Sequence, residues 1–169
     1  PLQIVLAGKA HPRDEQGKRL IEALHAHMRD LEGAVAVAYL PGYDMATALA
    51  MVAGVDVWLN TPLRPMEASG TSGMKAAFNG VPQLSVLDGW WVEGCIEGVS
   101  GWAIGDDAPS ANGVDGEHLY QKLEHTVLPL YYQDQTAWTA VMKGAIAQCA
   151  SRFNSQRMMR RYAAEAYIR

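Results

Sequence analysis

The sequence predicts an α/β fold in which flanking helices cover a parallel sheet. Short apolar runs alternate with longer amphipathic segments up to about residue 105. The run at 2–6 is short and continuous, which is typical of a strand that is covered on both faces of a sheet. Alternation of strand and helix favours parallel strands connected by crossover helices.

Each element follows from its local pattern of residues. Strands are expected at 2–6, 34–40, 55–59, 82–86 and 101–104. Helices are expected at 13–30, at 44–53 and around Lys75. The first helix places Leu20, Ile21, Leu24 and Met28 on one side, as an amphipathic helix requires.

The chain becomes helical from about residue 116 onward. Helices are expected at 117–126, at 137–148 and at 155–168, with Asn154 as the cap of the last one. In that last helix we expect a buried stripe formed by Met158, Tyr162 and Ala166. The stretch 105–116, rich in Asp, Gly, Pro, Ser and Asn, reads as a surface loop.

Composition favours one globular domain over residues 1–169, with an α/β part at 1–105 and a helical tail at 116–169. Of the 169 residues, 49% are hydrophobic and 19% are charged, which argues against disorder. The net charge of −4 and the absence of basic stretches with interleaved aromatics argue against nucleic acid as a partner. The sequence contains no apolar run long enough to span a membrane. Cys95 and Cys149 lack metal-ligand spacing and read as free thiols of a cytoplasmic protein.

The segment Glu67-Ala-Ser-Gly-Thr-Ser-Gly-Met-Lys75 follows an apolar run and leads into a helix. Strand, glycine-rich turn and helix together build an anion site, because the first N–H groups of a helix have no partner within it. Gly70 and Gly73 would let the backbone approach a ligand closely. Thr71 or Ser72 could cap the helix and offer a hydroxyl to the anion.

Lys75 would then lie in the first helical turn, with its amine reaching back toward the anion. An amine beside a phosphate cradle is what pyridoxal phosphate requires. A solvated lysine on a tight turn explains the spacing equally well. A P-loop and a dinucleotide fingerprint are both excluded, because the glycine and lysine spacings do not match them.

The segment from Asn60 to Gly80 closely resembles the cofactor-lysine region of α-glucan phosphorylases, the glycogen and maltodextrin enzymes, in their shorter bacterial form. Stretches at 7–12, 43–45, 84–93, 101–105 and 127–153 resemble the same family in the same order. The resemblance implies part of the C-terminal domain of a GT-B glycosyltransferase fold, in which two Rossmann-like domains face each other. The chain begins within a strand and without an initiator methionine, so we expect a piece of a longer enzyme.

The resemblance also implies roles for individual residues. Lys75 stands where the family holds pyridoxal 5'-phosphate as a Schiff base, and Tyr43 stands near that cofactor. The cofactor phosphate would be held by Thr71 and Ser72. The resemblance assigns the contacts with the transferred glucose to Glu67, Ala68, Ser69 and Gly70.

The parent enzyme would release glucose 1-phosphate from an α-1,4-glucan by using inorganic phosphate. The resemblance places the family's Arg/Lys cluster for inorganic phosphate before Pro1, so no complete catalytic set is expected in this chain. The isolated chain should therefore be inactive and should depend on the rest of the same polypeptide. Whether the parent forms a homo-oligomer stays open.

The sequence departs from the better-known members at two places. They carry Gly-Thr-Gly-Asn-Met-Lys where this chain has Gly70-Thr-Ser-Gly-Met-Lys75, and some carry arginine at the position of Asp44. The backbone donors are retained, so cofactor binding is expected to survive. Two alternatives stay open: a non-catalytic sugar- or anion-binding module, and a nucleotide-sugar-dependent glucan synthase of the same fold.

Several other residues have a structural interpretation beside a functional one. Trp90 and Trp91 could stack on sugar, although core packing is the stronger interpretation. Asp88 could act on a substrate or cap a turn. The histidines lack metal-ligand partners at the right spacing, so no metal site is predicted.

Overall fold

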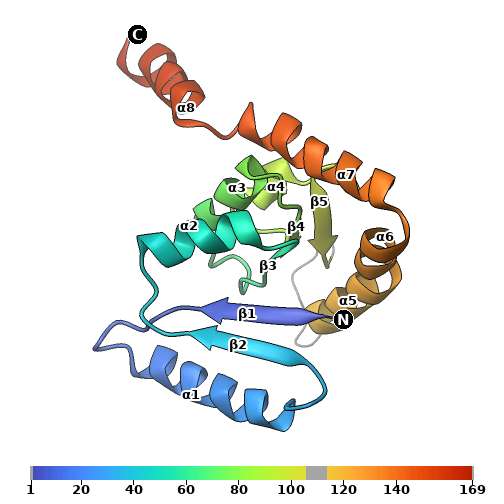
Figure 1. The fold of residues 1–169 in the computed structure, drawn as a ribbon. Coiled ribbons are helices and arrows are strands. Elements are labelled where there is room, and N and C mark those ends of the chain that lie inside the picture. The colour runs from blue at the N-terminus through green and yellow to red at the C-terminus, as the bar shows by residue number, and fades with distance from the viewer. Residues whose placement is uncertain (1, 106–113, 169) are drawn as a thin grey trace. The chain divides into compact units, whose positions relative to one another are not determined.

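The computed structural model describes residues 2–105 and 114–168 (Figure 1). The chain divides into two compact units, Pro1–Ala50 and Met51–Arg169, and each is described by itself. The expected α/β class is confirmed, and each expected strand is present in the same order. The hydrogen-bonded strands form a two-stranded sheet, β1–β2, and a three-stranded sheet, β3–β4–β5.

The first unit is built on a parallel strand pair covered by one long helix (Figure 1). Strand β1 (Gln3–Ala7) pairs with β2 (Ala36–Leu40) in a register that sets Ile4 beside Val37 and Leu6 beside Tyr39. These four side chains are half-buried and share one face of the pair.

Helix α1 (Glu15–Asp30) begins at Asp14, whose carboxylate accepts a hydrogen bond from the N–H of Gly17. Its half-buried apolar side includes Ile21, Leu24 and Met28, as expected. Leu20 is 65% exposed, so its placement on that side was wrong.

The second unit is organised around strand β4. Strands β3 (Trp58–Asn60), β4 (Gln83–Val86) and β5 (Gly101–Ile104) are parallel, and every residue of the central strand β4 is buried. Both faces of this strand are covered, so even its polar residues Gln83 and Ser85 are buried. Helix α2 (Met45–Gly54) precedes this sheet and runs across the boundary between the two units.

Helices pack around this sheet in two main clusters. Trp102 and Trp138 stack with ring centroids 5.8 Å apart in a core that also holds Leu84, Val86, Ile104, Val127 and Val141. Helix α3 (Thr71–Phe78) contributes Ala77 to a second cluster with Trp90, Trp91, Ala145 and Cys149. The short helix α4 (Trp91–Gly94), which the sequence pattern did not indicate, carries Trp91 into this cluster.

The helical tail is confirmed, although it is divided more finely than expected. In Figure 1 its helices follow β5 and run past the sheet of the second unit. Three of its segments are π-helical turns, which widen a helix locally. The elements are α5 (Val114–Lys122), η1 (Leu123–Val127), α6 (Leu128–Gln133), α7 (Gln135–Gly144), η2 (Ala145–Ala150), α8 (Ser155–Tyr162) and η3 (Ala163–Tyr167). Most of the loop expected at 105–116 lies outside the described residues.

The last helix confirms one expectation and contradicts another. Asn154 caps α8, because its side-chain oxygen accepts a hydrogen bond from the N–H of Arg157 at 2.8 Å. The expected buried stripe is wrong: Met158 is 46% exposed, Tyr162 is 54% exposed, and no residue described in α8 is buried. The apolar side of this amphipathic helix is therefore not covered by the described residues.

Candidate functional site

Helix α3 starts at the glycine-rich turn, but its cap is not the expected one. Gly70 is the N-cap, in the left-handed conformation with φ 83° and ψ 44°, and the helix begins at Thr71. This conformation suits glycine because it has no Cβ. The expectation that Thr71 or Ser72 caps the helix was therefore wrong, since both lie inside its first turn.

The first turn of α3 is free to accept an anion. No described side chain caps this turn, and the N–H of Gly73 bonds back to the carbonyl of Gly70 at 3.2 Å. The N–H groups of Thr71 and Ser72 point out of the helix start with no acceptor among the described residues. Thr71 is exposed and Ser72 is half-buried, so ligand can reach both.

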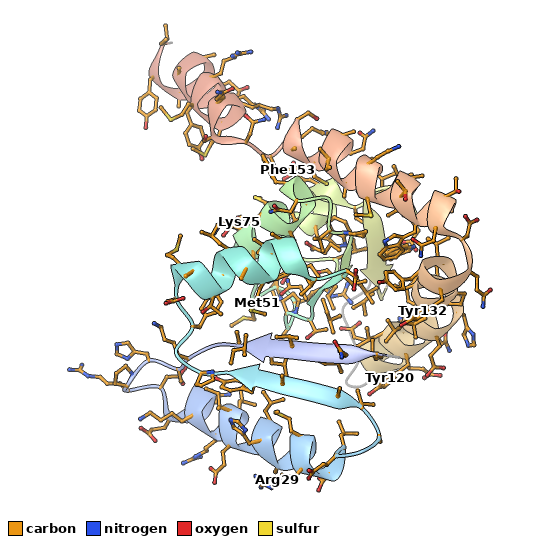
Figure 2. The ribbon with its side chains drawn as sticks, viewed as in Figure 1. Arg29, Met51, Lys75, Tyr120, Tyr132 and Phe153 are labelled. Carbon is orange, nitrogen blue, oxygen red and sulfur yellow. The ribbon has the colours of Figure 1, made fainter. Side chains whose placement is uncertain are left out.

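Lys75 is exposed on α3 and lies further along the helix than expected (Figure 2). Because the helix begins at Thr71, Lys75 is in its last turn rather than its first. The four intervening steps amount to about 6 Å at the rise of an α-helix, a distance that a lysine side chain leaning toward the N-terminus can span. The amine therefore remains within reach of the helix start.

The loop before α3 is tied to the end of strand β4 by Asp88. Its Oδ2 accepts a hydrogen bond from the N–H of Glu67 at 2.9 Å, and its Oδ1 accepts one from the N–H of Gly89 at 2.9 Å. The N–H of Trp90 donates to the carbonyl of Ser69 at 2.8 Å. Asp88 thus organises the loop, which is the structural one of the two roles that the sequence left open for it.

Gly89 lets the two loops come together. Its φ is 55°, and a Cβ at this position would lie 2.7 Å from the carbonyl oxygen of Ser69 and 2.9 Å from Cγ of Glu67. No other residue type would fit both the conformation and the space. An Asp-Gly pair one residue beyond the end of a buried strand is the sequence signal that points to this turn.

Trp90 and Trp91 belong to the core, as the stronger of their two interpretations predicted. Trp90 is 4% exposed and Trp91 is fully buried. The ring of Trp90 meets Phe153 edge to face with centroids 5.0 Å apart. Neither tryptophan can present its face to a sugar in this arrangement.

Gly73 has a packing role that the sequence did not indicate. It is buried, and a Cβ there would overlap Oε1 of Gln83 and lie 3.0 Å from Nε1 of Trp90. Gly70 is closer to the loop, and its Cβ would lie 3.1 Å from Cδ1 of Trp90. Gly73 thus makes room for Gln83, and the close approach to a ligand expected at this position stays a prediction.

The structure brings most of the predicted site residues together in one segment of the second unit. Glu67, Ser69, Gly70, Thr71, Ser72 and Lys75 lie on the tethered loop and on α3, and Ala68 lies between them. Tyr43 belongs to the first unit, so its position near the cofactor stays a prediction. Asp44 bonds the N–H of Thr47 at 2.8 Å, and this backbone donor lowers the pKa of its carboxyl.

The two cysteines are free thiols, as expected. Cys149 is buried and Cys95 is half-buried. Burial raises the pKa of Cys95 to about 12 and that of Cys149 to about 11. Neither thiol is suited to nucleophilic chemistry near neutral pH, because the thiolate is the reactive form.

Within residues 2–105 and 114–168, no three His, Cys, Asp or Glu side chains gather as a group that could hold a metal ion. None of the helices described here is both long and apolar enough to cross a membrane.

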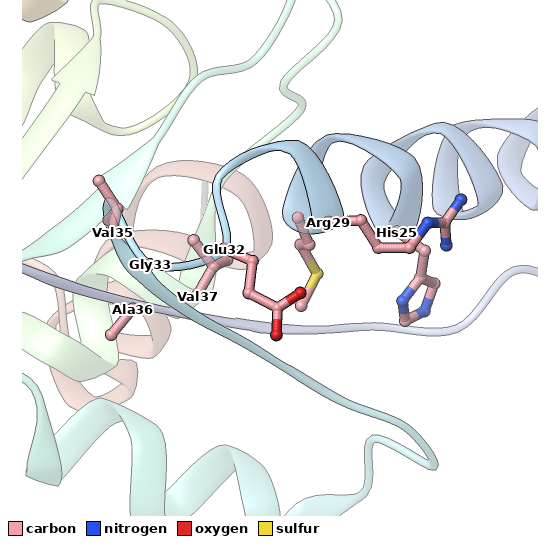
Figure 3. A pocket seen from close by; sticks show the side chains of 8 residues that line it. His25, Arg29, Glu32, Gly33, Val35, Ala36 and Val37 are labelled. Atoms are coloured by element: carbon pink, nitrogen blue, oxygen red, sulfur yellow. The ribbon is translucent and has the colours of Figure 1, made fainter.

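An open hollow of about 400 Å³ lies in the first unit (Figure 3). His25, Arg29 and Glu32 of α1 and the following turn line it, together with Val35 and the start of β2. It contains none of the predicted site residues, so the candidate site remains the Gly70–Lys75 segment.

The fold resembles that of a solved sugar-nucleotide complex. The crystal structure of Anabaena Alr3699/HepE in complex with UDP-glucose superimposes with a TM-score of 0.72, covering 96% of this chain and 40% of that one. The sequences are 20% identical, so the likeness concerns the fold alone. It agrees with the expected place of this chain in a glycosyltransferase fold of the GT-B type.

The sequence comparisons are more specific. The family model of the carbohydrate phosphorylases matches residues 1–101. The chain is 47% identical to maltodextrin phosphorylase of Thermococcus litoralis over 172 residues, 99% of this chain and 21% of that protein. It is 46% identical to glycogen phosphorylase of Aquifex aeolicus over 174 residues, 99% of this chain and 25% of that protein. The chain belongs to the carbohydrate phosphorylase family and spans a fifth to a quarter of the length of these relatives.

Proposed function

We propose that this chain is the cofactor-bearing C-terminal part of an α-1,4-glucan phosphorylase that uses pyridoxal 5'-phosphate. The observation behind this proposal is the exposed Lys75 on a helix whose first two N–H groups, those of Thr71 and Ser72, have no acceptor among the described residues. An amine and an anion-binding helix start on one short helix fit the aldehyde and the phosphate of that cofactor. Membership of the carbohydrate phosphorylase family supports the same assignment.

Each residue of the segment then has a stated task. Lys75 would hold the cofactor through Nζ, while the N–H groups of Thr71 and Ser72 would bind its phosphate. When bound, pyridoxal phosphate supplies a phosphate group that can exchange a proton with inorganic phosphate. Glu67, kept in place by Asp88, would accept hydrogen bonds from glucose hydroxyls, because a carboxylate is a strong acceptor.

The full enzyme would convert an α-1,4-glucan and inorganic phosphate into glucose 1-phosphate in the cytoplasm. The isolated chain spans a quarter or less of the length of these two phosphorylases, so we expect it to be inactive. Such chemistry depends on positioning and charge stabilisation, which here would need groups from the rest of the polypeptide. Formation of glucose 1-phosphate from maltodextrin above a no-protein control would contradict this expectation.

The cofactor assignment is tested by incubating the chain with pyridoxal phosphate, reducing with borohydride and mapping the labelled peptides. The lysines are Lys9, Lys18, Lys75, Lys122 and Lys143. We expect selective labelling of Lys75, and we expect pyridoxal, which lacks the phosphate, to label it much more slowly. Equal labelling by the two aldehydes would contradict a phosphate site at the start of α3.

Lys143 provides a matched control, because it too is exposed and lies in the last turn of a helix. Lys75→Arg should abolish selective labelling, whereas Lys143→Arg should leave it unchanged. Labelling spread over all the exposed lysines would contradict the assignment. If pyridoxal phosphate labels the lysines without preference and UDP-glucose slows the labelling of Lys75, a nucleotide-sugar-dependent enzyme would be favoured instead.

A further inference from the structure

The loop between β3 and α3, residues 61–70, reverses the usual placement of charged and apolar side chains. Leu63 is 75% exposed and Met66 is 76% exposed, whereas the side chain of Arg64 between them is only 13% exposed. Charged side chains are rarely covered in this way unless they are paired. A covered arginine between two exposed apolar residues therefore indicates a specific contact for its guanidinium.

The guanidinium of Arg64 contacts Asp115 of α5. Its Nη2 lies 3.5 Å from Oδ1 of Asp115, whose side chain is 29% exposed. Gly105, which directly follows β5, packs against both groups, because a Cβ on it would lie 2.7 Å from that oxygen and 3.3 Å from that nitrogen. Three segments of the second unit thus meet at this ion pair: the 61–70 loop, the end of β5 and the start of α5.

The surroundings of the pair favour a structural contact over a ligand site. Asp115 lies in the first turn of α5, where the helix dipole stabilises a negative charge. The guanidinium of Arg64 is mostly covered and already shares its charge with this carboxylate, so it is poorly placed to bind a substrate phosphate. Because both side chains are partly covered, loss of one partner leaves the other charge poorly compensated. The ion pair can therefore hold together two segments that are 51 residues apart in the sequence.

We propose that Arg64 is a positioning residue, which holds the 61–70 loop against the start of α5 through its ion pair with Asp115. Asp88 holds the same loop at Glu67. With both contacts in place, Glu67 keeps a fixed position beyond the carboxyl ends of the strands, where ligands bind in parallel α/β sheets. The helical tail thereby takes part in shaping the sugar site. That role in glucose binding rests on the proposed function, whereas the contact between loop and tail does not.

Amide hydrogen exchange of the loop tests the contact between loop and tail. Asp115→Asn keeps the shape of the side chain and removes its charge. The N–H of Met66 bonds the carbonyl of Leu63, and the N–H of Glu67 bonds Asp88. We expect both amides to exchange about tenfold faster in Asp115→Asn, because the loop opens more often when the ion pair is lost. Exchange at the wild-type rate would overturn the contact.

Lys122→Gln is the matched control, because Lys122 lies on the same helix and pairs with Glu97, a residue before β5, at 2.6 Å. It should leave the exchange of both loop amides unchanged. Equal acceleration in Lys122→Gln and Asp115→Asn would show only a loosened α5 and would overturn a specific role of Arg64. Arg64→Gln combined with Asp115→Asn should exchange no faster than the faster single variant, because both substitutions remove the same contact. Effects that multiply in the double variant would contradict the pair.

The positioning role is tested by the kinetics of the full enzyme that contains this chain, in the direction of glucan synthesis. We expect Asp115→Asn to lower kcat/KM for glucose 1-phosphate about tenfold, because small displacements of substrate-binding groups cost large factors in rate. The KM for the glucan should not change, and Lys122→Gln should alter neither value. An unchanged kcat/KM in Asp115→Asn would overturn the positioning role. Absence of phosphorylase activity in the wild-type enzyme would overturn the proposed function, and hydrogen exchange would still decide whether the contact holds the loop.

Discussion

Asp88 holds the backbone of Glu67 in place across the end of strand β4, with its Oδ2 accepting the Glu67 N–H at 2.9 Å. The same carboxylate accepts the N–H of Gly89, so one side chain joins two loops that are separated by twenty-one residues in the sequence. Glu67, the residue proposed to bind glucose hydroxyls, is therefore positioned by a residue of another loop.

Asp88→Ala should lower the free energy of unfolding by about 1–3 kcal/mol, because it leaves two backbone donors without their acceptor. Urea unfolding of the chain measures this change. Glu93→Gln is the control, because Glu93 is exposed on the neighbouring helix α4, and it should change little. An unfolding midpoint for Asp88→Ala equal to that of the control would show that the tether does not stabilise the fold.

Gly89→Ala should be more destabilising than Gly98→Ala. Both glycines have positive φ, 55° and 71°, so both substitutions incur a conformational cost of about 1–2 kcal/mol. Only at Gly89 would the new Cβ collide with Ser69 and Glu67, while nothing lies within 4 Å of it at Gly98. The difference between the two unfolding free energies measures the close approach of the loops, and a difference of zero would contradict it.

Removing the N-cap side chains of α7 and α8 should affect stability differently. Asp134 accepts the N–H of Ala137 at the start of α7, which carries the buried residues Trp138 and Val141. Asp134→Ala should therefore cost about 1 kcal/mol of global stability. Asn154→Ala should mainly increase hydrogen exchange within α8, which has no buried residue among those described. An equal loss of global stability in both variants would contradict this distinction.

The thiols should be unreactive while the chain is folded. The pKa of Cys149 is raised to about 11 and that of Cys95 to about 12 by burial, from 9.0. At pH 8, alkylation should be slower than in the denatured chain by about 100-fold for Cys149 and about 1000-fold for Cys95, in proportion to the thiolate. Mass spectrometry of iodoacetamide-treated protein measures both rates.

The sign of the linked pH dependence follows from the same raised pKa values. The folded chain keeps its thiol protons at a pH where the unfolded chain has lost them, so burial of the neutral thiols stabilises the fold below pH 9. This contribution should be lost as the pH rises from 9 through 11. Cys149→Ser should reduce the loss of stability over that range, and an unchanged pH profile would contradict the burial.

Sequence patterns were sufficient for the strands, most helices and the cap of α8. Strand β4 was predicted at 82–86, within one residue of its observed bounds, because a strand between two helices is a short local segment. The cap at Asn154 was predicted because capping involves residues only three positions apart. The cap of α3 was predicted wrongly, since Thr71 and Ser72 have good capping side chains and Gly70 has none.

The sequence by itself determined the class of fold, the family and the segment that includes Lys75, because periodicity and a contiguous motif are local properties of a chain. Only the tertiary structure decided what Gly73 and Asp88 do and that α8 has no buried face. The missing side chain of Gly73 leaves the space that the carboxamide of Gln83 occupies, and the carboxylate of Asp88 accepts the N–H of Glu67. These dependencies join residues that are distant in the sequence, and they arise only when burial brings one side chain against another's backbone.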